Sequence, residues 1–465
     1  MSSEISLKFS EDSSKKAFDL NHRKTINFNI SRYDEAVRQG QQQFRDLEKA
    51  RKRAAILKHR VLNDLDSYLI EFESNFTKHG GKVLWAQNTR EALKEITAIL
   101  KKHKARQVVK MKSMAAEEIA LNEALAKNKI ESQETDLGEY IVQLCNEHPY
   151  HIVTPVMHKS KEDIAVLFNE KFNLDLNSTP EDITLFVRKL LREKFMTADA
   201  GITGANFLIS DIGAVALTEN EGNGLMSFSF PRLHIVIAGI DKIIPSLDDL
   251  HLFWPLLATQ GTGQNITVYN TIISGPRQNE ETDGPDEMVV ILLDNNRTEV
   301  LKQKEQRRAL SCIHCGACLN ACPVYKNIGG HTYGVTYSGP IGSVITPFLN
   351  GFRDYKHLSY ACSLCGRCSD VCPVKINLPE LLLYNRNDAV IKKFTTWKER
   401  IAMNMWKKAM MKRWMVDFFG VRTKSILFSW AFRKTWGVRR TLPVIKEKTF
   451  KQLWSESGRE ENAIH

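Results

Sequence analysis

The residues of this 465-residue chain that could do chemistry are concentrated in one segment, which holds eight of the nine cysteines. The pattern Cys-x2-Cys-x2-Cys-x3-Cys-Pro occurs there twice. In each copy the first three thiolates are spaced to bind one iron-sulfur cubane, and the fourth, held by the following proline, points toward the other cluster. The pattern therefore predicts two 4Fe-4S clusters, one ligated by Cys312, Cys315, Cys318 and Cys372 and the other by Cys362, Cys365, Cys368 and Cys322.

Zinc binding or disulfide bonding could also account for such a group of cysteines. A four-cysteine zinc site normally takes two separated pairs, whereas each motif here offers three evenly spaced thiolates and a Cys-Pro. Disulfides need an oxidising compartment, and the chain starts Met-Ser-Ser-Glu-Ile-Ser-Leu-Lys, without the apolar segment of an export signal. We therefore expect a cytoplasmic iron-sulfur protein. Within the loops of the motifs, His314 and Arg367 are expected to be exposed. The alternative is that they donate hydrogen bonds to the clusters and tune their reduction potential.

Four regions of different composition surround and contain these motifs. Residues 1–80 carry apolar side chains at helical spacing, which predicts a helical arm packed on the next domain. Residues 81–295 alternate β-rich and helix-like segments, which predicts an α/β domain with a layered sheet. Residues 296–390 hold the cysteines between helix-compatible flanks, and residues 391–465 form a tail. The strands expected in the α/β domain are 82–86, 107–111, 206–210, 214–218, 233–240, 266–271 and 288–293, and its helices are 89–102, 114–127 and 181–195.

The tail accounts for the net charge of +11, because it contains 18 Lys and Arg against 6 Asp and Glu. It also holds six of the eight tryptophans, at positions 397, 406, 414, 430, 436 and 454. Several of them recur with Met and Ile at helical spacing between lysines, which predicts a helix that packs on its own chain or on a partner. A basic amphipathic helix could also lie on an anionic membrane surface. Nucleic acid is not expected, since the basic residues alternate with Trp, Met and Phe and no nucleic-acid motif accompanies them. No apolar run approaches the ~20 residues that span a bilayer.

The α/β domain offers a second candidate site. No Gly-x-Gly-x-x-Gly or phosphate-loop motif marks a nucleotide site. Two lysines end one strand just before a helix start, which is a natural place for an anion. Two clusters of Gly and Asn follow further along, and turns alone would explain them. The alternative is a pocket for a small carboxylate, built from Lys110, Lys112, Asn206, Glu219 and Asn223.

At these residues the chain resembles the family of lactate-utilization iron-sulfur proteins, the B components of a three-part bacterial L-lactate oxidation system. The resemblance covers nearly the whole length. The motifs that carry it are residues 111–114, 117–118 and 122, 136–140, 203–206, 219–224, 274–277, 283–285 and 338–342, together with both cysteine motifs.

The resemblance implies a lactate-utilization domain with a fold like that of sugar-phosphate isomerases and coenzyme A transferases, followed by an α-helical double-cubane ferredoxin domain. It also implies two partners, a cysteine-rich subunit similar to heterodisulfide reductase components and a smaller lactate-utilization-domain protein. Together they would oxidise L-lactate to pyruvate, with this chain as an electron-transfer subunit and not a complete enzyme. A non-catalytic electron-transfer adapter of another such complex is the alternative.

Overall fold

The computed structural model describes residues 4–412, 414–415, 420–433, 441–448 and 450–461. The chain forms two compact units, Met1–Ile391 and Lys392–His465. The first contains the candidate sites and is described first.

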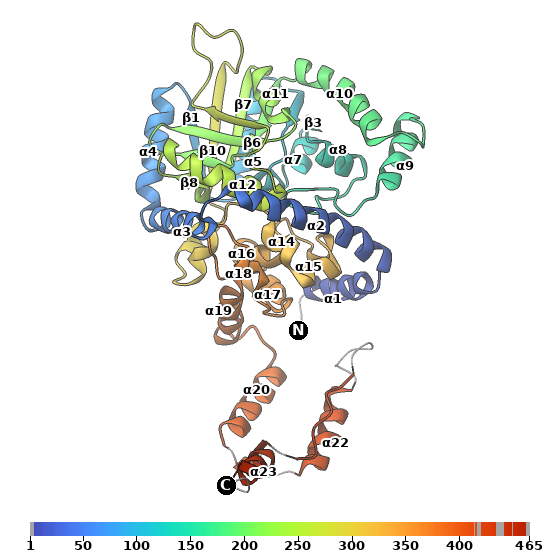
Figure 1. Ribbon diagram of the computed structural model, residues 1–465. Helices are drawn as coiled ribbons and strands as arrows, with labels where there is room; N and C mark the ends of the chain where they lie inside the picture. The colour runs from blue at the N-terminus through green and yellow to red at the C-terminus, as the bar shows by residue number, and fades with distance from the viewer. Residues whose placement is uncertain (1–3, 413, 416–419, 434–440, 449, 462–465) are drawn as a thin grey trace. The chain divides into compact units, whose positions relative to one another are not determined.

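A six-stranded sheet organises the first unit (Figure 1), and all of its neighbouring strands are parallel. The two strands with the highest apolar content are residues 233–239 and 287–293. They lie inside the sheet and are buried on both faces, which explains their nearly continuous runs of Val, Ile and Leu. The strand order is β1 (Lys82–Ala86), β10 (Glu287–Leu293), β7 (Leu233–Gly239), β4 (Ala200–Thr203), β2 (Gln107–Lys110) and β3 (Glu131–Glu134).

Alternate residues of these strands face two different apolar cores. Ile235 and Ile291 pack against a layer of three helices, α5 (Thr89–Lys102), α6 (Met114–Glu118) and α7 (Leu121–Lys127). Val236 and Val290 face the opposite side, where they meet α4 (Leu65–Lys78), α11 (Asn223–Ser229) and a second sheet. A third apolar cluster joins α8 (Leu137–Leu144), α9 (Lys161–Phe172) and α10 (Pro180–Thr197) beside β2.

The second sheet has four strands in the order β8 (Ile243–Ile244), β5 (Phe207–Ile209), β6 (Ala214–Glu219) and β9 (Tyr269–Ile273). Its far face packs against α12 (Leu250–Thr262) and against the cysteine-bearing region, in one continuous core. The cysteine-bearing region is helical, with α13 (Arg297–Leu301), α14 (Ala317–Ala321), α15 (Pro323–Ile328), α16 (Gly339–Asn350), α17 (Phe352–Tyr360), α18 (Arg367–Asp370) and α19 (Leu378–Ile391). Buried side chains of the α/β domain and of the iron-sulfur region therefore form one continuous apolar core.

The N-terminal arm consists of α1 (Glu4–Ala17), α2 (Leu20–Gly40), α3 (Leu47–Asn63) and α4. It contacts both domains, because α1 packs on α15 and α17 while α2 packs on α12. Arg51 in α3 donates to the carbonyl oxygen of Cys372, at 3.0 Å from Nε and 2.8 Å from Nη2. The arm thus holds the second cysteine motif in place.

The expected strands are all present, with ends shifted by a few residues. The sequence prediction missed β3, β4 and β8, which are two to four residues long. The helix expected over residues 114–127 is broken into α6 and α7, because Ala120 adopts a left-handed conformation with φ 52°.

The second unit contains α20 (Trp397–Met410), α22 (Val421–Phe432) and α23 (Phe450–Glu461). Trp397, Ile401 and Trp406 on α20 are all at least 50% exposed. Of the tryptophans counted in the tail, Trp436 lies outside the described residues. Among the described helices of the whole chain, none is both long and apolar enough to cross a membrane.

Candidate iron-sulfur and ligand site

The two cysteine motifs fold into equivalent loops. His314 and Leu364, each two residues after the first cysteine of its motif, have φ of 59° and 56°. The backbone N–H groups of these two residues donate to the sulfurs of Cys312 and Cys362, at 3.4 and 3.3 Å. The glycine that follows the second cysteine is left-handed in both loops, at Gly316 and Gly366. A repeated sequence has therefore produced a repeated cradle of peptide N–H groups around sulfur.

The eight thiols gather into two groups. Burial raises the pKa of Cys318, and the neighbouring thiols that raise it further are Cys312, Cys315 and Cys372. Burial likewise raises the pKa of Cys368 to about 12, with Cys322, Cys362 and Cys365 as the neighbours that raise it further. The fourth cysteine of each motif thus lies with the first three cysteines of the other motif.

This donor set fits iron-sulfur clusters. All eight cysteines are free thiols, and Cys322 and Cys372 also accept backbone N–H groups at 3.5 and 3.3 Å. Burial raises the pKa of Cys312 to about 12, so each such sulfur must lose a proton when iron binds. The peptide N–H of Ile341, in the first turn of α16, lowers the pKa of Cys318 and so favours negative charge on this sulfur.

The two groups differ in exposure. Cys315, Cys318 and Cys372 of the first group are 6–8% exposed, whereas Cys365 of the second group is exposed. The first group lies on the side of the α/β domain, because Lys242 and Asp241 at the end of β7 are electrostatic neighbours of Cys312. Cys312 and Cys362 are half-buried, so Cys365 of the second group is the most exposed of the motif cysteines.

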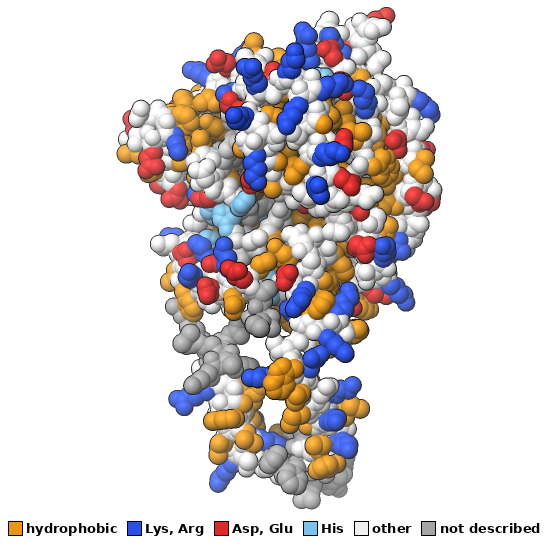
Figure 2. Space-filling model, turned by 180° about the vertical axis from the view of Figure 1, so that it is seen from behind, with side chains coloured by type: hydrophobic (Ala, Val, Ile, Leu, Met, Phe, Trp, Pro, Cys, Tyr) orange, Lys and Arg blue, Asp and Glu red, His pale blue; other side chains and the backbone are white. Residues whose placement is uncertain are grey.

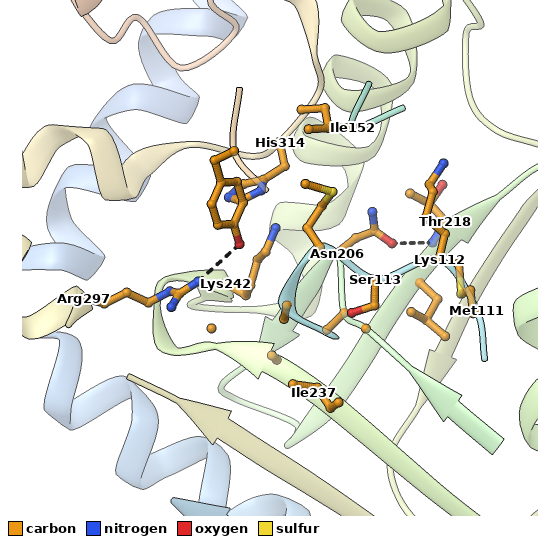
Figure 3. A pocket seen from close by; sticks show the side chains of 18 residues that line it. Met111, Lys112, Ser113, Ile152, Asn206, Thr218, Ile237, Lys242, Arg297 and His314 are labelled. Carbon is orange, nitrogen blue, oxygen red and sulfur yellow. Dashed lines mark hydrogen bonds between the residues drawn. The ribbon is translucent and has the colours of Figure 1, made fainter. Parts of the chain in front are cut away.

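A cavity of about 130 Å³ lies where the α/β domain meets the first cysteine loop (Figure 3). It opens at the carboxyl ends of three neighbouring strands, which is where open α/β sheets bind ligands. Lys112 and Ser113 follow β2, Asn206 follows β4, and Lys242 follows β7. His314 and Tyr337 close the cavity from the iron-sulfur side. His314 is 13% exposed, so the prediction that it is an exposed loop residue was wrong.

A buried charge network fixes one wall of the cavity. The guanidinium of Arg297, 4% exposed, donates to Asp241 Oδ1 at 2.6 Å and to Glu118 Oε2 at 2.7 Å. Tyr337 donates to the same Glu118 oxygen at 2.7 Å, which ties the iron-sulfur region to α6. Burial would raise the pKa of Glu118, but Arg297 outweighs that effect and holds it below its usual value. The same cation holds the pKa of Asp241 far below its usual range against the effect of burial.

The residues predicted for a carboxylate pocket are divided by the structure. Lys112 and Asn206 line the cavity. Lys110 points elsewhere: it is fully buried and ion-paired to Glu134 at 2.8 Å and to Glu117 at 3.4 Å. The parallel register places Lys110 opposite Glu134 on β3, so its charge is neutralised inside the sheet.

The other two predicted residues flank the turn between β6 and α11. Both carboxylate oxygens of Glu219 accept backbone N–H groups, from Gly224 at 2.7 Å and from Leu225 at 2.8 Å, and thereby cap that helix. Asn223 donates to Thr135 at 3.3 Å and lines a separate cavity of about 770 Å³ beside α10. The five predicted residues therefore do not share one cavity.

The cavity also contains polar residues that the sequence prediction did not select, namely Lys242, Arg297, His314 and Tyr337. One signal was present for Lys242, which follows an expected strand at its carboxyl end just as Lys112 does. Arg297 and Tyr337 carried no such signal, because only the tertiary packing brings them to the sheet edge.

Comparisons with known proteins agree with this architecture. The family model of the LUD domain matches residues 69–293, and that of the 4Fe-4S dicluster domain matches residues 308–376. The chain therefore carries an α/β LUD domain followed by a ferredoxin-type iron-sulfur domain, as expected. A crystal structure of a DUF162 family protein from Deinococcus radiodurans matches 49% of this chain and 98% of its own, at 15% identity and a TM-score of 0.28.

Two curated relatives cover most of the chain. "Uncharacterized electron transport protein YkgF" of Escherichia coli (strain K12) is 41% identical over 362 residues, 78% of this chain and 76% of the relative. "Lactate utilization protein B" of Bacillus cereus (strain AH820) is 44% identical over 351 residues, 75% of this chain and 74% of the relative. At this identity and coverage, and with both domains in the same chain, the protein belongs to the lactate utilization protein B family.

Proposed function

We propose that this protein is the iron-sulfur electron-transfer subunit of a system that oxidises L-lactate to pyruvate. The relatives named for lactate utilization and for electron transport support the pathway and the role. The observation that carries the proposal is the position of the cavity, whose wall includes His314, between Cys312 and Cys315. A small molecule in the cavity would therefore touch the loop that carries the first cysteine group.

The electron count balances with two clusters, which is the number that two groups of four thiols can hold. L-lactate loses two electrons and two protons when its secondary alcohol becomes the ketone of pyruvate. Each 4Fe-4S cluster, when bound, carries one electron at a time. Residues Cys312, Cys315, Cys318 and Cys372 would hold the cluster nearer the cavity, and the second group, with its exposed Cys365, would face an acceptor.

The partners proposed for the chain are a cysteine-rich, heterodisulfide-reductase-like subunit and a smaller LUD-domain protein. The tail supports a docking role, because α20 exposes Trp397, Ile401 and Met405 among lysines. On the face seen in Figure 2, apolar and basic side chains alternate over the tail helices. Deleting residues 392–465 is expected to abolish copurification of the partners while leaving the iron content of the chain unchanged.

Lactate-dependent reduction of the clusters tests the proposed function. The tagged chain is copurified with its partners under anaerobic conditions, mixed with L-lactate, and followed by electron paramagnetic resonance. We expect reduced-cluster signals with L-lactate, and none with 1,2-propanediol, which has the same hydroxyl group but no carboxylate. Clusters that dithionite reduces and L-lactate leaves oxidised would contradict the proposal and favour an adapter of another complex.

A further inference from the structure

Lys242 lines the cavity and, unlike the other cations of its wall, makes no hydrogen bond or ion pair with a described residue. Arg297 is held by two carboxylates, and Lys112 donates to the carbonyl oxygen of Val153 at 2.8 Å and pairs with Asp136 at 3.6 Å. Within the part of the chain that the structure describes, Lys242 Nζ has neither a hydrogen-bond partner nor an ion-pair partner. Burial lowers the pKa of Lys242, against the raising effect of the neighbouring Asp241. A partly buried ammonium without a partner points to an anionic ligand.

Asn206 supplies a second free group at the same place. Its Oδ1 accepts the backbone N–H of Thr218 at 2.9 Å, which fixes the orientation of the amide. Among the described residues no group accepts a hydrogen bond from Nδ2, so its two N–H donors are left for a ligand. Figure 3 shows the amide nitrogen on the side away from Thr218, with Lys242 and His314 around the same space.

The size of the cavity restricts the ligand. An engineered cavity of about 150 Å³ in another protein takes benzene, which has six non-hydrogen atoms. L-lactate and pyruvate also have six, so the cavity of about 130 Å³ has room for either acid. Apart from Ser113 and Thr218, much of the remaining wall is apolar, from Met111, Met114, Ile152 and Ile237, and suits a methyl group.

From these observations we infer that the cavity binds a three-carbon 2-hydroxy or 2-oxo monocarboxylate, with its carboxylate on Lys242 and an oxygen at Asn206 Nδ2. One cation of the cavity wall without a partner among the described residues matches one anionic group. The choice of lactate and pyruvate as ligands rests on the proposed function, but their binding is a property of this chain alone. Two of the predicted pocket residues, Lys112 and Asn206, therefore line the proposed site, while Lys242 supplies the positive charge that binds the carboxylate of the ligand.

Lys242 has one alternative role. It is an electrostatic neighbour of Cys312 and would balance the negative charge of a cluster there. In that case replacing it would shift the reduction potential of the cluster and leave ligand affinity unchanged. The two roles therefore differ in a measurable way.

Calorimetric titration of the full-length, iron-sulfur-loaded chain under anaerobic conditions tests the inference. The probes are L-lactate, pyruvate, 1,2-propanediol and orthophosphate. We expect the two acids to bind and the diol to fail. Lys242→Met should weaken binding of both acids at least tenfold, because a charge-assisted hydrogen bond is lost. Lys194→Met, which removes a half-buried lysine paired with Glu131 outside the cavity, is the matched control and should not change the affinity.

Asn206→Asp is a second, nearly isosteric variant, in case Lys242→Met does not fold. The aspartate can still accept the N–H of Thr218, but it loses the amide donors and places a negative charge beside the carboxylate. It should also weaken binding at least tenfold. Orthophosphate binding more tightly than either acid, or a Lys242→Met chain with unchanged affinity and a shifted cluster potential, would overturn the inference.

Failure of this inference can be told apart from failure of the proposed function. If the isolated chain binds neither acid while L-lactate still reduces the clusters of the assembled complex, the cavity is not the site. If the chain binds both acids while the clusters of the complex stay oxidised, the cavity binds the acids and the electron-transfer role is wrong.

Discussion

Replacing Arg297 by leucine would test whether the junction of the two domains depends on a buried charge network. Arg297 is 4% exposed and bridges Asp241 at 2.6 Å and Glu118 at 2.7 Å. Leucine would leave both carboxylates buried without their cation, and breaking a buried pair by removing one partner costs about 3–5 kcal/mol. We expect the free energy of unfolding to fall by about 4 kcal/mol.

Two further variants separate the geometry of the network from its charge. Arg297→Lys keeps the positive charge but lacks the planar fork that donates to two carboxylates at once, so we expect a loss of about 2 kcal/mol. Arg277→Leu removes an arginine that pairs with Asp286 at 2.7 Å at the surface, where both side chains are more than 40% exposed. This matched control should cost at most about 1 kcal/mol.

Pulse proteolysis in urea under anaerobic conditions measures these changes, because it scores the folded fraction of the 1–391 body independently of the tail. The expected order of urea midpoints is wild type and Arg277→Leu, then Arg297→Lys, then Arg297→Leu. The reasoning is refuted if Arg297→Leu unfolds at the same urea concentration as Arg277→Leu. Full recovery in Arg297→Lys would show that charge alone matters.

Two other outcomes follow from the structure. His234 is fully buried, which lowers its pKa to about 3, and a lowered histidine pKa means that stability present above pH 6.5 is lost as the pH falls toward 3. The free energy of unfolding of the wild type should therefore fall by about 2 kcal/mol between pH 7 and pH 5 because of this residue. The destabilisation caused by His234→Gln, measured by urea unfolding at each pH, should be smaller at pH 5 by the same amount. An equal destabilisation at both pH values would contradict this. Because Cys372 lies with the first cysteine group, Cys372→Ala and Cys318→Ala should lose the same cluster signal in electron paramagnetic resonance, and Cys365→Ala the other. If Cys372→Ala and Cys365→Ala instead lost the same cluster signal, the fourth cysteine of each motif would not belong to the cluster of the other motif, and the predicted arrangement would be contradicted.

Much of the fold was predictable from local patterns. The helix over Thr89–Lys102 and the strand over Lys82–Ala86 have the expected bounds. The strand Glu131–Glu134 was missed because it is polar and at the edge of the sheet, so no apolar periodicity marks it. Its Glu134 is buried because it pairs with Lys110, a contact that exists only in the folded sheet.

The candidate sites were predictable to different degrees. A cluster motif is local, since the spacing of thiols along the chain already matches the geometry of a cubane. The sequence by itself therefore determined the type of cofactor, and it predicts the eight cysteines as the ligands. It did not reveal that Arg51 of the N-terminal arm would hold the backbone of Cys372, because these residues are far apart in the chain.

The tertiary structure decided most of the candidate cavity, although the sequence had already indicated Lys112 and Asn206. Lys110 and Lys112 are two residues apart, yet one is neutralised inside the sheet and the other reaches the cavity. Lys242 has no ion-pair partner among the described residues, because Arg297 already pairs with the neighbouring Asp241. A binding site depends on which charges remain unpaired after packing, and pairing is set by distances in space between strand ends and a loop of another domain. Residue types along a sequence do not contain those distances.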